Sequence, residues 1–514
     1  MKKQTRLLSM LLALLFLILP LASCDGGSGD DVDGGGIGDD GTISWDEVDF
    51  KGTTLKFAVS ENQNAEVTFG ASNVYLQGVD ESTTDEVLKK VKERNTKVEN
   101  DLNLKVEYIP IDEWYDGVFN DIEMKVLGSS EDAPDLYNND MYGLNPAILA
   151  GYLMNVKNPL DATGQPTTSY FNFNYDGWNM DFMEGATFDS SKVYLLVGDY
   201  HIDVIRMAWV FYVNKTMFNQ NAAALGLGAS DISDFYDYVL DGIWDWDMMS
   251  DLADKIWQDN GSIKNTADEN DGRVGLAINH VSEWIFESST GLTTFQMGED
   301  GRARVIDGID EYQRMASSYR DNIQSVKTAD GVYYYYDVIS STNCFIKGNF
   351  LFAHAVLGEM ESKELRDVNF EKGLVPVPKY HNSRQEEYHT MVHDQAEVTA
   401  VLVTTSSFGR ASAFMQYVNE ESRPVLTEYY EFALKFKYNE DPDIRKMIDL
   451  VYNSIDNPFG MQFQGIIMKN YADTGVESLR GGLAGNTVSQ IWDGNKTAYI
   501  GALDKAFAAF NKIQ

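Results

Sequence analysis

Residues 53–60, TTLKFAVS, and residues 82–111, STTDEVLKKVKERNTKVENDLNLKVEYIPI, decide the fold class of this chain. Residues 53–60 and residues 104–111, LKVEYIPI, are rich in β-forming side chains and predict two strands. Between them, Val87, Val91 and Val98 fall on one side of a helix, whose first turn we expect Ser82 or Thr83 to cap. The order strand, helix, strand predicts neighbouring parallel strands with helices on the faces of the sheet.

The same alternation continues along the chain. Residues 113–130 predict a helix and residues 134–140, PDLYNND, a third strand. Residues 192–200 and 207–215 predict two adjacent strands, and the chain after Arg423 is expected to be largely helical. The whole pattern predicts an α/β protein. With about 465 residues beyond the N-terminal region, the chain is too long for one ordinary core, so we expect two or more lobes.

The N-terminus has the pattern of an export signal. Lys2, Lys3 and Arg6 precede an apolar run from residue 7 to 22, which is short for a membrane-spanning helix. Residues 21–24, LASC, resemble the bacterial lipobox. We therefore expect residues 1–23 to be a lipoprotein signal peptide and Cys24 to carry a diacylglycerol, since two acyl chains suffice for stable attachment. The alternatives are an ordinary signal peptide with an incidental cysteine and a retained transmembrane anchor.

Residues 24–49 predict a flexible tether. Residues 25–41 contain eight glycines and six aspartates, and no basic residue. Glycine gives flexibility, and repulsion between aspartates extends the chain. A calcium site is the alternative, but the stretch lacks the EF-hand pattern.

Charge and cysteine content limit the possible partners. The net charge is −38, and about −41 without the first 24 residues, so the surface repels nucleic acid and anionic lipids. Beyond Cys24 the sequence contains only Cys344, which excludes an internal disulfide after processing and predicts a buried, inert thiol.

Four segments, in this order, resemble the extracellular solute-binding proteins of bacterial ABC importers, the family that includes maltose-binding proteins. The resemblance covers residues 55 to about 510. Its motifs are Tyr212-Val213-Asn214-Lys215, with one valine inserted; Trp246-Asp247, without the usual threonine; Pro376-Val377-Pro378 after FLFAHAVLGEMESKELRD; and AVLVTTSSFGRASAFMQYV at 400–418.

The resemblance implies a type II periplasmic-binding-protein-like fold, with two lobes joined by a hinge that the chain crosses several times. By analogy, lobe one would comprise 50–205 and 376–410, lobe two 206–375 and 411–514, and the hinge would include Pro376 and Pro378. The resemblance also implies a monomeric, extracytoplasmic receptor, lipid-anchored to the cell membrane, that delivers its ligand to the permease subunits of an ABC transporter.

Ligands of open α/β sheets bind beyond the carboxyl ends of the strands. Polar and aromatic residues follow the expected strands there, and two further tryptophans are candidates for stacking on a sugar. Carboxylates and amides suit hydroxyl groups, whereas anions favour arginine forks or helix N-termini. We therefore predict a carbohydrate, most simply an oligosaccharide. The candidate ligand-binding residues are Glu61, Gln63, Asn138, Asp140, Trp178, Asp199, Tyr200, Asn279 and Trp284, with partners of Asp140 and Asp199 expected near Asn279 and Trp284.

Two other classes remain open. A secreted carbohydrate-active hydrolase would need two carboxylates about 5 to 10 Å apart, and the sequence shows no recognisable pair. A surface lipoprotein without a transport role is the other alternative. His389 and His393 lack the glutamate of a zinc-protease motif. We therefore predict no catalytic residue, no cofactor and no metal site.

Overall fold

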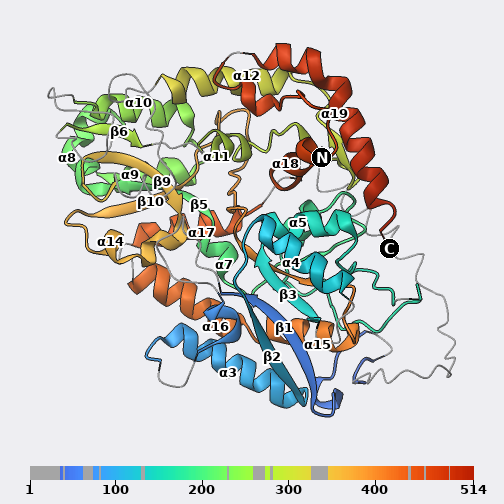
Figure 1. Ribbon diagram of the computed structural model, residues 1–514. Coiled ribbons are helices and arrows are strands. Elements are labelled where there is room, and N and C mark those ends of the chain that lie inside the picture. The colour runs from blue at the N-terminus through green and yellow to red at the C-terminus, as the bar shows by residue number, and fades with distance from the viewer. Residues whose placement is uncertain are drawn as a thin grey trace, which may run out of the picture. The chain divides into compact units, whose positions relative to one another are not determined.

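The structure is a computed structural model of the chain (Figure 1). It describes residues 35–38, 41–61, 73–79, 83–128, 133–161, 163–227, 231–258, 272–277, 282–325, 345–437, 442–456, 459–485 and 487–513. The predicted signal peptide, Cys24, Gln63, Asn279 and Cys344 lie outside these residues. In the part that is described, no helix combines the length and apolar character needed to cross a bilayer.

The first sheet contains the alternating segments from which the fold was predicted. Its strand order is β2-β1-β3-β11-β4, with β1 parallel to β2 and β3, and β11 antiparallel to β3 and β4. The parallel strands confirm the predicted strand–helix–strand unit. The strands are β1 (Thr53–Ser60), β2 (Leu104–Ile111), β3 (Leu136–Asp140), β4 (Leu195–Leu196) and β11 (Glu397–Val401).

Helix α3 (Glu86–Asp101) shows why the first connection folds as expected. Val87, Val91 and Val98 are buried, as predicted from their spacing. The predicted cap is wrong: the Asp85 carboxylate accepts hydrogen bonds from the N–H groups of Val87 and Leu88. Thr83 lies two residues before this N-cap, and its hydroxyl oxygen accepts a hydrogen bond from the Asp85 N–H.

The second sheet has the order β10-β5-β9-β6. Strand β5 is antiparallel to β10 and β9, while β6 is parallel to β9. Every residue of β5 and β9 is buried, since helices cover both faces. The strands are β5 (Trp209–Asn214), β6 (Val274–Ala277), β9 (Phe350–Val356) and β10 (Lys372–Pro376), and a separate antiparallel pair consists of β7 (Phe295–Met297) and β8 (Ala303–Val305).

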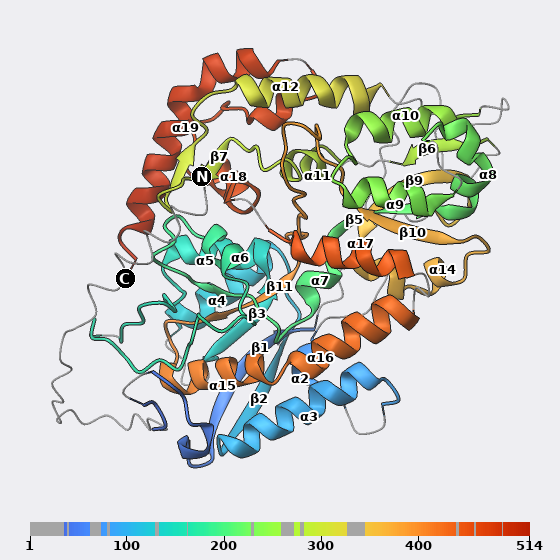
Figure 2. The same cartoon turned by 180° about the vertical axis from the view of Figure 1, so that it is seen from behind.

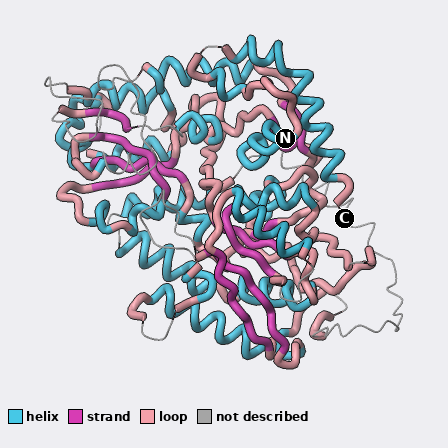
Figure 3. Tube along the Cα trace, viewed as in Figure 1, coloured by secondary structure: helices cyan, strands magenta, loops and turns pink. Residues whose placement is uncertain are grey.

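The expectation that 192–200 and 207–215 are adjacent strands is wrong. They form β4 of the first sheet and β5 of the second, because the chain crosses between the sheets through α7 (Asp203–Arg206). The chain returns between β10 and β11, and the two crossings lie side by side: the Trp209 N–H donates to the Met391 carbonyl and the His393 N–H to the Met207 carbonyl. The multiple crossings predicted for this fold are confirmed, and the strands form two separate groups (Figure 3).

The predicted hinge prolines lie at the end of the second sheet. The carbonyl of Pro376, the last residue of β10, accepts a hydrogen bond from Trp244 Nε1 at 2.9 Å, and the Pro378 carbonyl accepts one from Trp246 Nε1 at 3.1 Å. The lobe boundaries and the role of these prolines in movement stay predictions.

Helices surround the sheets, and the C-terminal part is largely helical, as expected (Figures 1 and 2). Helix α18 (Phe459–Asn470) contacts α5 beside the first sheet and β7 of the separate strand pair. The other α-helices are α2 (Val74–Gln77), α4 (Asp116–Leu127), α5 (Met141–Ala150), α6 (Met180–Gly185), α8 (Lys215–Leu225), α9 (Ile232–Leu240), α10 (Trp246–Ile256), α11 (Ser282–Ser288), α12 (Asp310–Ser318), α14 (Lys363–Arg366), α15 (Phe408–Glu420), α16 (Arg423–Thr427), α17 (Pro442–Asn453) and α19 (Val488–Phe510). The 3-10 helices are η1 (Trp45–Glu47), η4 (Leu357–Glu361) and η6 (Leu479–Gly482), and the π-helices are η2 (Tyr319–Gln324) and η5 (Glu428–Lys437).

Candidate functional site

A cavity of about 850 Å³, which we call the amide cleft, lies where elements of the two sheets meet. Helix α5 follows the carboxyl end of β3, and α11 follows that of β6. This is the edge at which open α/β sheets bind ligands. Its lining includes Asp116, Phe119, Asn120, Tyr142, Asn145, Glu283, Trp284, Asp394, Gln462, Gln464, Lys469, Tyr471 and Arg480.

Asp140 fixes the geometry beside this cleft. The carboxylate caps α5 by accepting from the Gly143 N–H at 2.7 Å, and its other oxygen accepts from the Tyr115 N–H at 2.9 Å. Tyr115 has a φ of 51°, a backbone conformation that costs energy for a bulky aromatic residue. One carboxylate thus fixes the N-terminal ends of both α4 and α5. Burial raises the pKa of Asp140 to about 7, against the opposing effect of these two hydrogen bonds.

Buried amides give the cleft its hydrogen-bonding character. Asn145 Nδ2 donates to Gln462 Oε1 at 2.8 Å, which connects α5 to α18. Within the described part of the chain, Asn145 Oδ1 and Gln464 Oε1 have no hydrogen-bond partner, although these residues are only 2% and 4% exposed. A buried acceptor without a partner costs about 1–3 kcal/mol. These two oxygens can therefore accept hydroxyl hydrogens at a gain in free energy.

Aromatic side chains lie in and beside the same cleft. Trp284 is half-buried in its wall and packs edge-on against the His393 ring, with centroids 5.9 Å apart. Tyr142 is 37% exposed, and its ring meets Tyr115 at 5.0 Å, which in turn lies 4.9 Å from the 46%-exposed Trp114. Exposed ring faces of this kind can cover the apolar C–H side of a sugar.

The cations of the cleft are already paired with acids. Lys469 Nζ lies 3.6 Å from Asp116, and Arg480 Nη1 lies 3.6 Å from the buried Glu287. Burial raises the pKa of Glu283, and the charge of Arg480 opposes that effect. A ligand anion would have to compete with these carboxylates, so the cleft favours a neutral ligand.

Two of the predicted residues lie elsewhere, in a cavity of about 360 Å³ that we call the tryptophan pocket. Trp178 is 4% exposed, and its Nε1 donates to Gln416 Oε1 at 2.9 Å. Asp199 also lines this pocket, and burial raises its pKa to about 6, against the effect of Arg423. The separation of Asp199 from Asp140 follows from the strand order, because β11 stands between β3, which ends at Asp140, and β4, which Asp199 follows.

The other predicted residues have different surroundings. Glu61 is exposed at the end of β1. Tyr200 is 1% exposed, and its hydroxyl donates to the Leu196 carbonyl at 2.6 Å. Asn138 is fully buried, donating to Glu397 at 2.8 Å and accepting from Thr399 at 2.9 Å. The structure therefore gives Tyr200 and Asn138 core positions, places Trp284 in the wall of the amide cleft, and places Asp140 at the N-cap of α5, beside that cleft.

Sequence reasoning missed Trp114, Tyr142 and the amides of α18. Trp114 follows β2 and Tyr142 follows β3, so the strand-end rule applied to all aromatic residues could have found them. Nothing in the sequence brings Gln462 and Gln464 to this place, because α18 lies more than 300 residues from α5.

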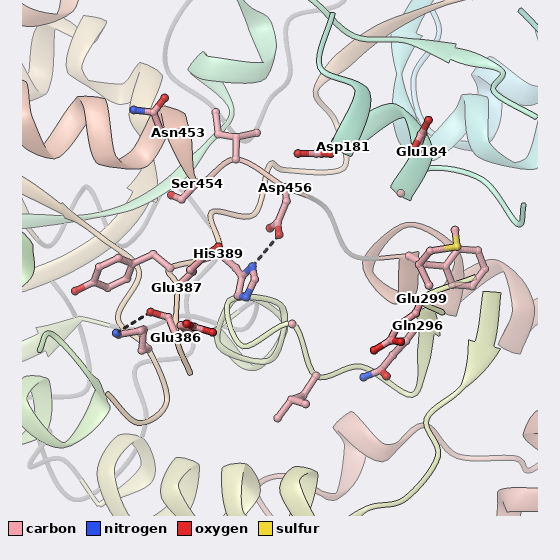
Figure 4. Close-up of a pocket in the computed structure, with 18 of the residues that line it drawn as sticks. Asp181, Glu184, Gln296, Glu299, Glu386, Glu387, His389, Asn453, Ser454 and Asp456 are labelled. Atoms are coloured by element: carbon pink, nitrogen blue, oxygen red, sulfur yellow. Dashed lines mark hydrogen bonds and ion pairs between the residues drawn. The ribbon is translucent and has the colours of Figure 1, made fainter. Parts of the chain in front are cut away.

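A third cavity, the acidic cavity, measures about 1310 Å³ (Figure 4). Acidic side chains stand on opposite walls, with Glu386 and Glu387 on one side and Glu184 and Glu299 on the other. His389 Nδ1 lies 2.7 Å from Asp456 Oδ2, whereas His393 pairs with Asp394. Across the described ranges, no three His, Cys, Asp or Glu side chains are placed to share a metal ion.

No family model matches the sequence, and no curated protein matches it. Solved structures do match. The galacto-N-biose/lacto-N-biose I-binding protein of an ABC transporter from Bifidobacterium longum, in complex with lacto-N-biose, has a TM-score of 0.50 at 12% identity, over 90% of this chain and 98% of that chain. Apo RafE from Streptococcus pneumoniae has a TM-score of 0.47 at 16% identity over 90% and 98% of the chains, and a family 1 extracellular solute-binding protein from Bifidobacterium longum subsp. infantis has 0.47 at 15% over 89% and 100%. The first likeness confirms the predicted type II two-sheet fold.

Proposed function

We propose that this chain is the extracytoplasmic solute-binding protein of an ABC importer and that it captures a neutral oligosaccharide in the amide cleft. The observation that carries this proposal is the pair of buried amide oxygens, Asn145 Oδ1 and Gln464 Oε1, which have no partner among the described residues of the cleft. Trp284 and Tyr142 supply ring faces in the same cavity.

The chemistry of the cleft supports a sugar over an anion. Amide and carboxylate oxygens accept from hydroxyl groups, while Lys469 and Arg480 are held by acids. The volume of about 850 Å³ falls within the range of about 300–1,000 Å³ for small-molecule sites. The structure of similar fold from Bifidobacterium longum contains lacto-N-biose, which agrees with a carbohydrate but does not select one.

Transport requires that the ligand change the protein. A ligand shifts a conformational equilibrium only by its difference in affinity for the two states. The amide cleft has walls from α5 beside the first sheet and from α11 beside the second, so one bound sugar contacts both. We propose that this contact stabilises a closed form, which the permease subunits recognise, and that the sugar leaves unaltered.

The N-terminus completes the proposal. Removal of residues 1–23 and diacylation of Cys24 would anchor the protein to the outer side of the cell membrane. The aspartate- and glycine-rich linker would hold the monomeric receptor away from the lipid surface. Mass spectrometry of the membrane fraction tests this part: a diacylated N-terminal Cys24 supports it, and an unprocessed chain contradicts it.

A thermal-shift screen over neutral oligosaccharides tests the central part. One sugar should raise the melting temperature, and chromatography should recover it intact after prolonged incubation. An enzyme would instead release shorter products.

Gln464→Leu then tests the carrying observation. It replaces an unpartnered buried acceptor by an apolar side chain of similar size, so the free protein should be as stable as the wild type or more stable. The sugar-induced shift should nevertheless decrease. A Gln464→Leu protein that responds to the sugar as the wild type does would contradict the proposed site.

A further inference from the structure

We infer that the tryptophan pocket is a second binding site, which takes the ammonium group of an aliphatic amine, and that the remaining length of the amine extends into the acidic cavity. This site lies apart from the amide cleft, and the two share no lining residue. The inference goes beyond the proposed sugar binding and does not depend on it.

The first observation is a buried nitrogen without a partner. His201 lines the tryptophan pocket and is 5% exposed, and its Nδ1 has no hydrogen-bond partner in the described residues. The other ring nitrogen, Nε2, lies 3.3 Å from Glu397 Oε2, an oxygen that also accepts from Asn138 Nδ2 at 2.8 Å. In the tautomer whose Nε2–H donates to this oxygen, Nδ1 carries no proton and can accept a hydrogen bond from an ammonium group.

The second observation is a half-buried carboxylate in the same pocket. Asp199 lines it, and burial raises the pKa of this carboxyl to about 6. The nearby cation is Arg423, which is 65% exposed and lies 3.8 Å from Asp176. A donor with a positive charge would satisfy both Asp199 and His201 Nδ1, whereas a second acceptor would leave both unpaired.

The walls indicate the shape of the donor. Val204, Ile205 and Leu426 give an apolar surface for methylene groups, and Trp178 and Tyr452 line the pocket with rings. Ring faces attract an organic cation when they are close to it. The pocket suits a primary ammonium on an alkyl chain better than a hydrated metal ion.

The acidic cavity continues from this pocket. The two share the lining residues Asp181, Asn453 and Ile455, of which Figure 4 labels Asp181 and Asn453 in the acidic cavity. Beyond them the walls carry acids, including Glu184 and Glu299. A linear amine with further ammonium groups could therefore place one end at Asp199 and the others among these acids.

Isothermal titration with spermidine tests the inference, because this probe has three ammonium groups on an alkyl chain. The wild type should bind one molecule, while 1,4-butanediol, which has no charge, should not bind. Asp199→Asn removes the charge with little change in shape and should weaken spermidine binding at least tenfold. Leu426→Trp fills the pocket without a change in charge and should do the same, so the test does not depend on one variant folding.

The control is Asp367→Asn, which changes the net charge equally at an exposed ion pair with Lys363. It should bind spermidine as the wild type does. Equal weakening by Asp199→Asn and Asp367→Asn, or wild-type binding by the two pocket variants, would show non-specific attraction to an acidic surface and overturn the inference. Sugar binding measured with the same variants should be unchanged, so failure of this inference is separate from failure of the proposed function.

Discussion

Asp140 should make the folded protein more stable at mildly acidic pH than at neutral pH. Its carboxylate is 5% exposed, and burial raises its pKa from the ordinary value of 3.8 to about 7. The folded state therefore binds this proton more tightly than the unfolded chain does. The resulting stabilisation is fully present below pH 3.8 and is lost as the pH rises to about 7.

The size of the effect follows from the two pKa values. A difference of about three pH units, at about 1.4 kcal/mol per unit, gives at most about 4 kcal/mol between pH 4 and pH 7. The pKa of about 7 already includes the hydrogen bonds from the Gly143 and Tyr115 N–H groups, which favour the ionised form, so about 4 kcal/mol is the upper bound for the measured change.

Asp140→Asn removes the titrating group. The amide keeps one acceptor oxygen for Gly143 but cannot accept from the Tyr115 N–H, so the variant should lose about 1–3 kcal/mol at every pH. Added to this constant loss is a pH-dependent part. The difference in the free energy of unfolding between wild type and variant should become smaller as the pH rises from 4.5 to 7.5, because the wild type loses the stabilisation from protonated Asp140. Urea unfolding followed by tryptophan fluorescence at four pH values measures both.

Asp85→Asn is the matched control, because Asp85 also caps a helix but is only half-buried. The reasoning that burial dominates the titration of Asp140 would be refuted by either of two results. One is a difference in the free energy of unfolding between Asp140→Asn and the wild type that stays constant with pH. The other is the same dependence of this difference on pH for Asp140→Asn and Asp85→Asn.

Three further substitutions test the packing and the site. Asp85→Ala removes the acceptor of two N–H groups at the start of α3 and should cost about 1 kcal/mol in urea unfolding, whereas Asp85→Ser should restore most of it. Arg206→Met should cost about 3–5 kcal/mol, because it leaves the carboxylates of Glu361 and Asp203 without their buried partner; a loss below 1 kcal/mol would contradict this. Tyr142→Ala should change stability by less than about 1 kcal/mol, because the side chain is 37% exposed, but should weaken sugar binding several-fold in a titration; unchanged binding would remove Tyr142 from the site.

The fold could be predicted from the sequence where its cause is local. Val87, Val91 and Val98 fix the buried side of α3 by spacing alone, and the strands around it follow from composition. The separation of β4 from β5 could not be predicted, because two apolar strands a few residues apart look like a neighbouring pair. Only the pairing of β11 with β4 and of β10 with β5 shows that the chain changes sheets there.

The candidate site also contains residues that could be predicted from the local sequence and residues that could not. Asp140 and Trp284 were predicted because Asp140 ends one expected strand and Trp284 lies a few residues beyond the end of another. Trp178 was equally plausible from its sequence, yet its indole is bonded to Gln416 in another cavity, and this depends on a contact across 238 residues. The unpartnered amides of α5 and α18 require the folded chain, since an amide shows no need for a ligand until its neighbours are known.

The central claim is that the amide cleft holds a neutral sugar, and isothermal titration of the sugar found by the thermal screen tests it most directly. Trp284→Ala removes a half-buried ring from the cleft, while Trp257→Ala removes an equally half-buried ring that lines none of the three cavities. We predict one sugar per chain, at least tenfold weaker binding by Trp284→Ala and wild-type binding by Trp257→Ala. Equal affinity of both variants and the wild type would contradict the account.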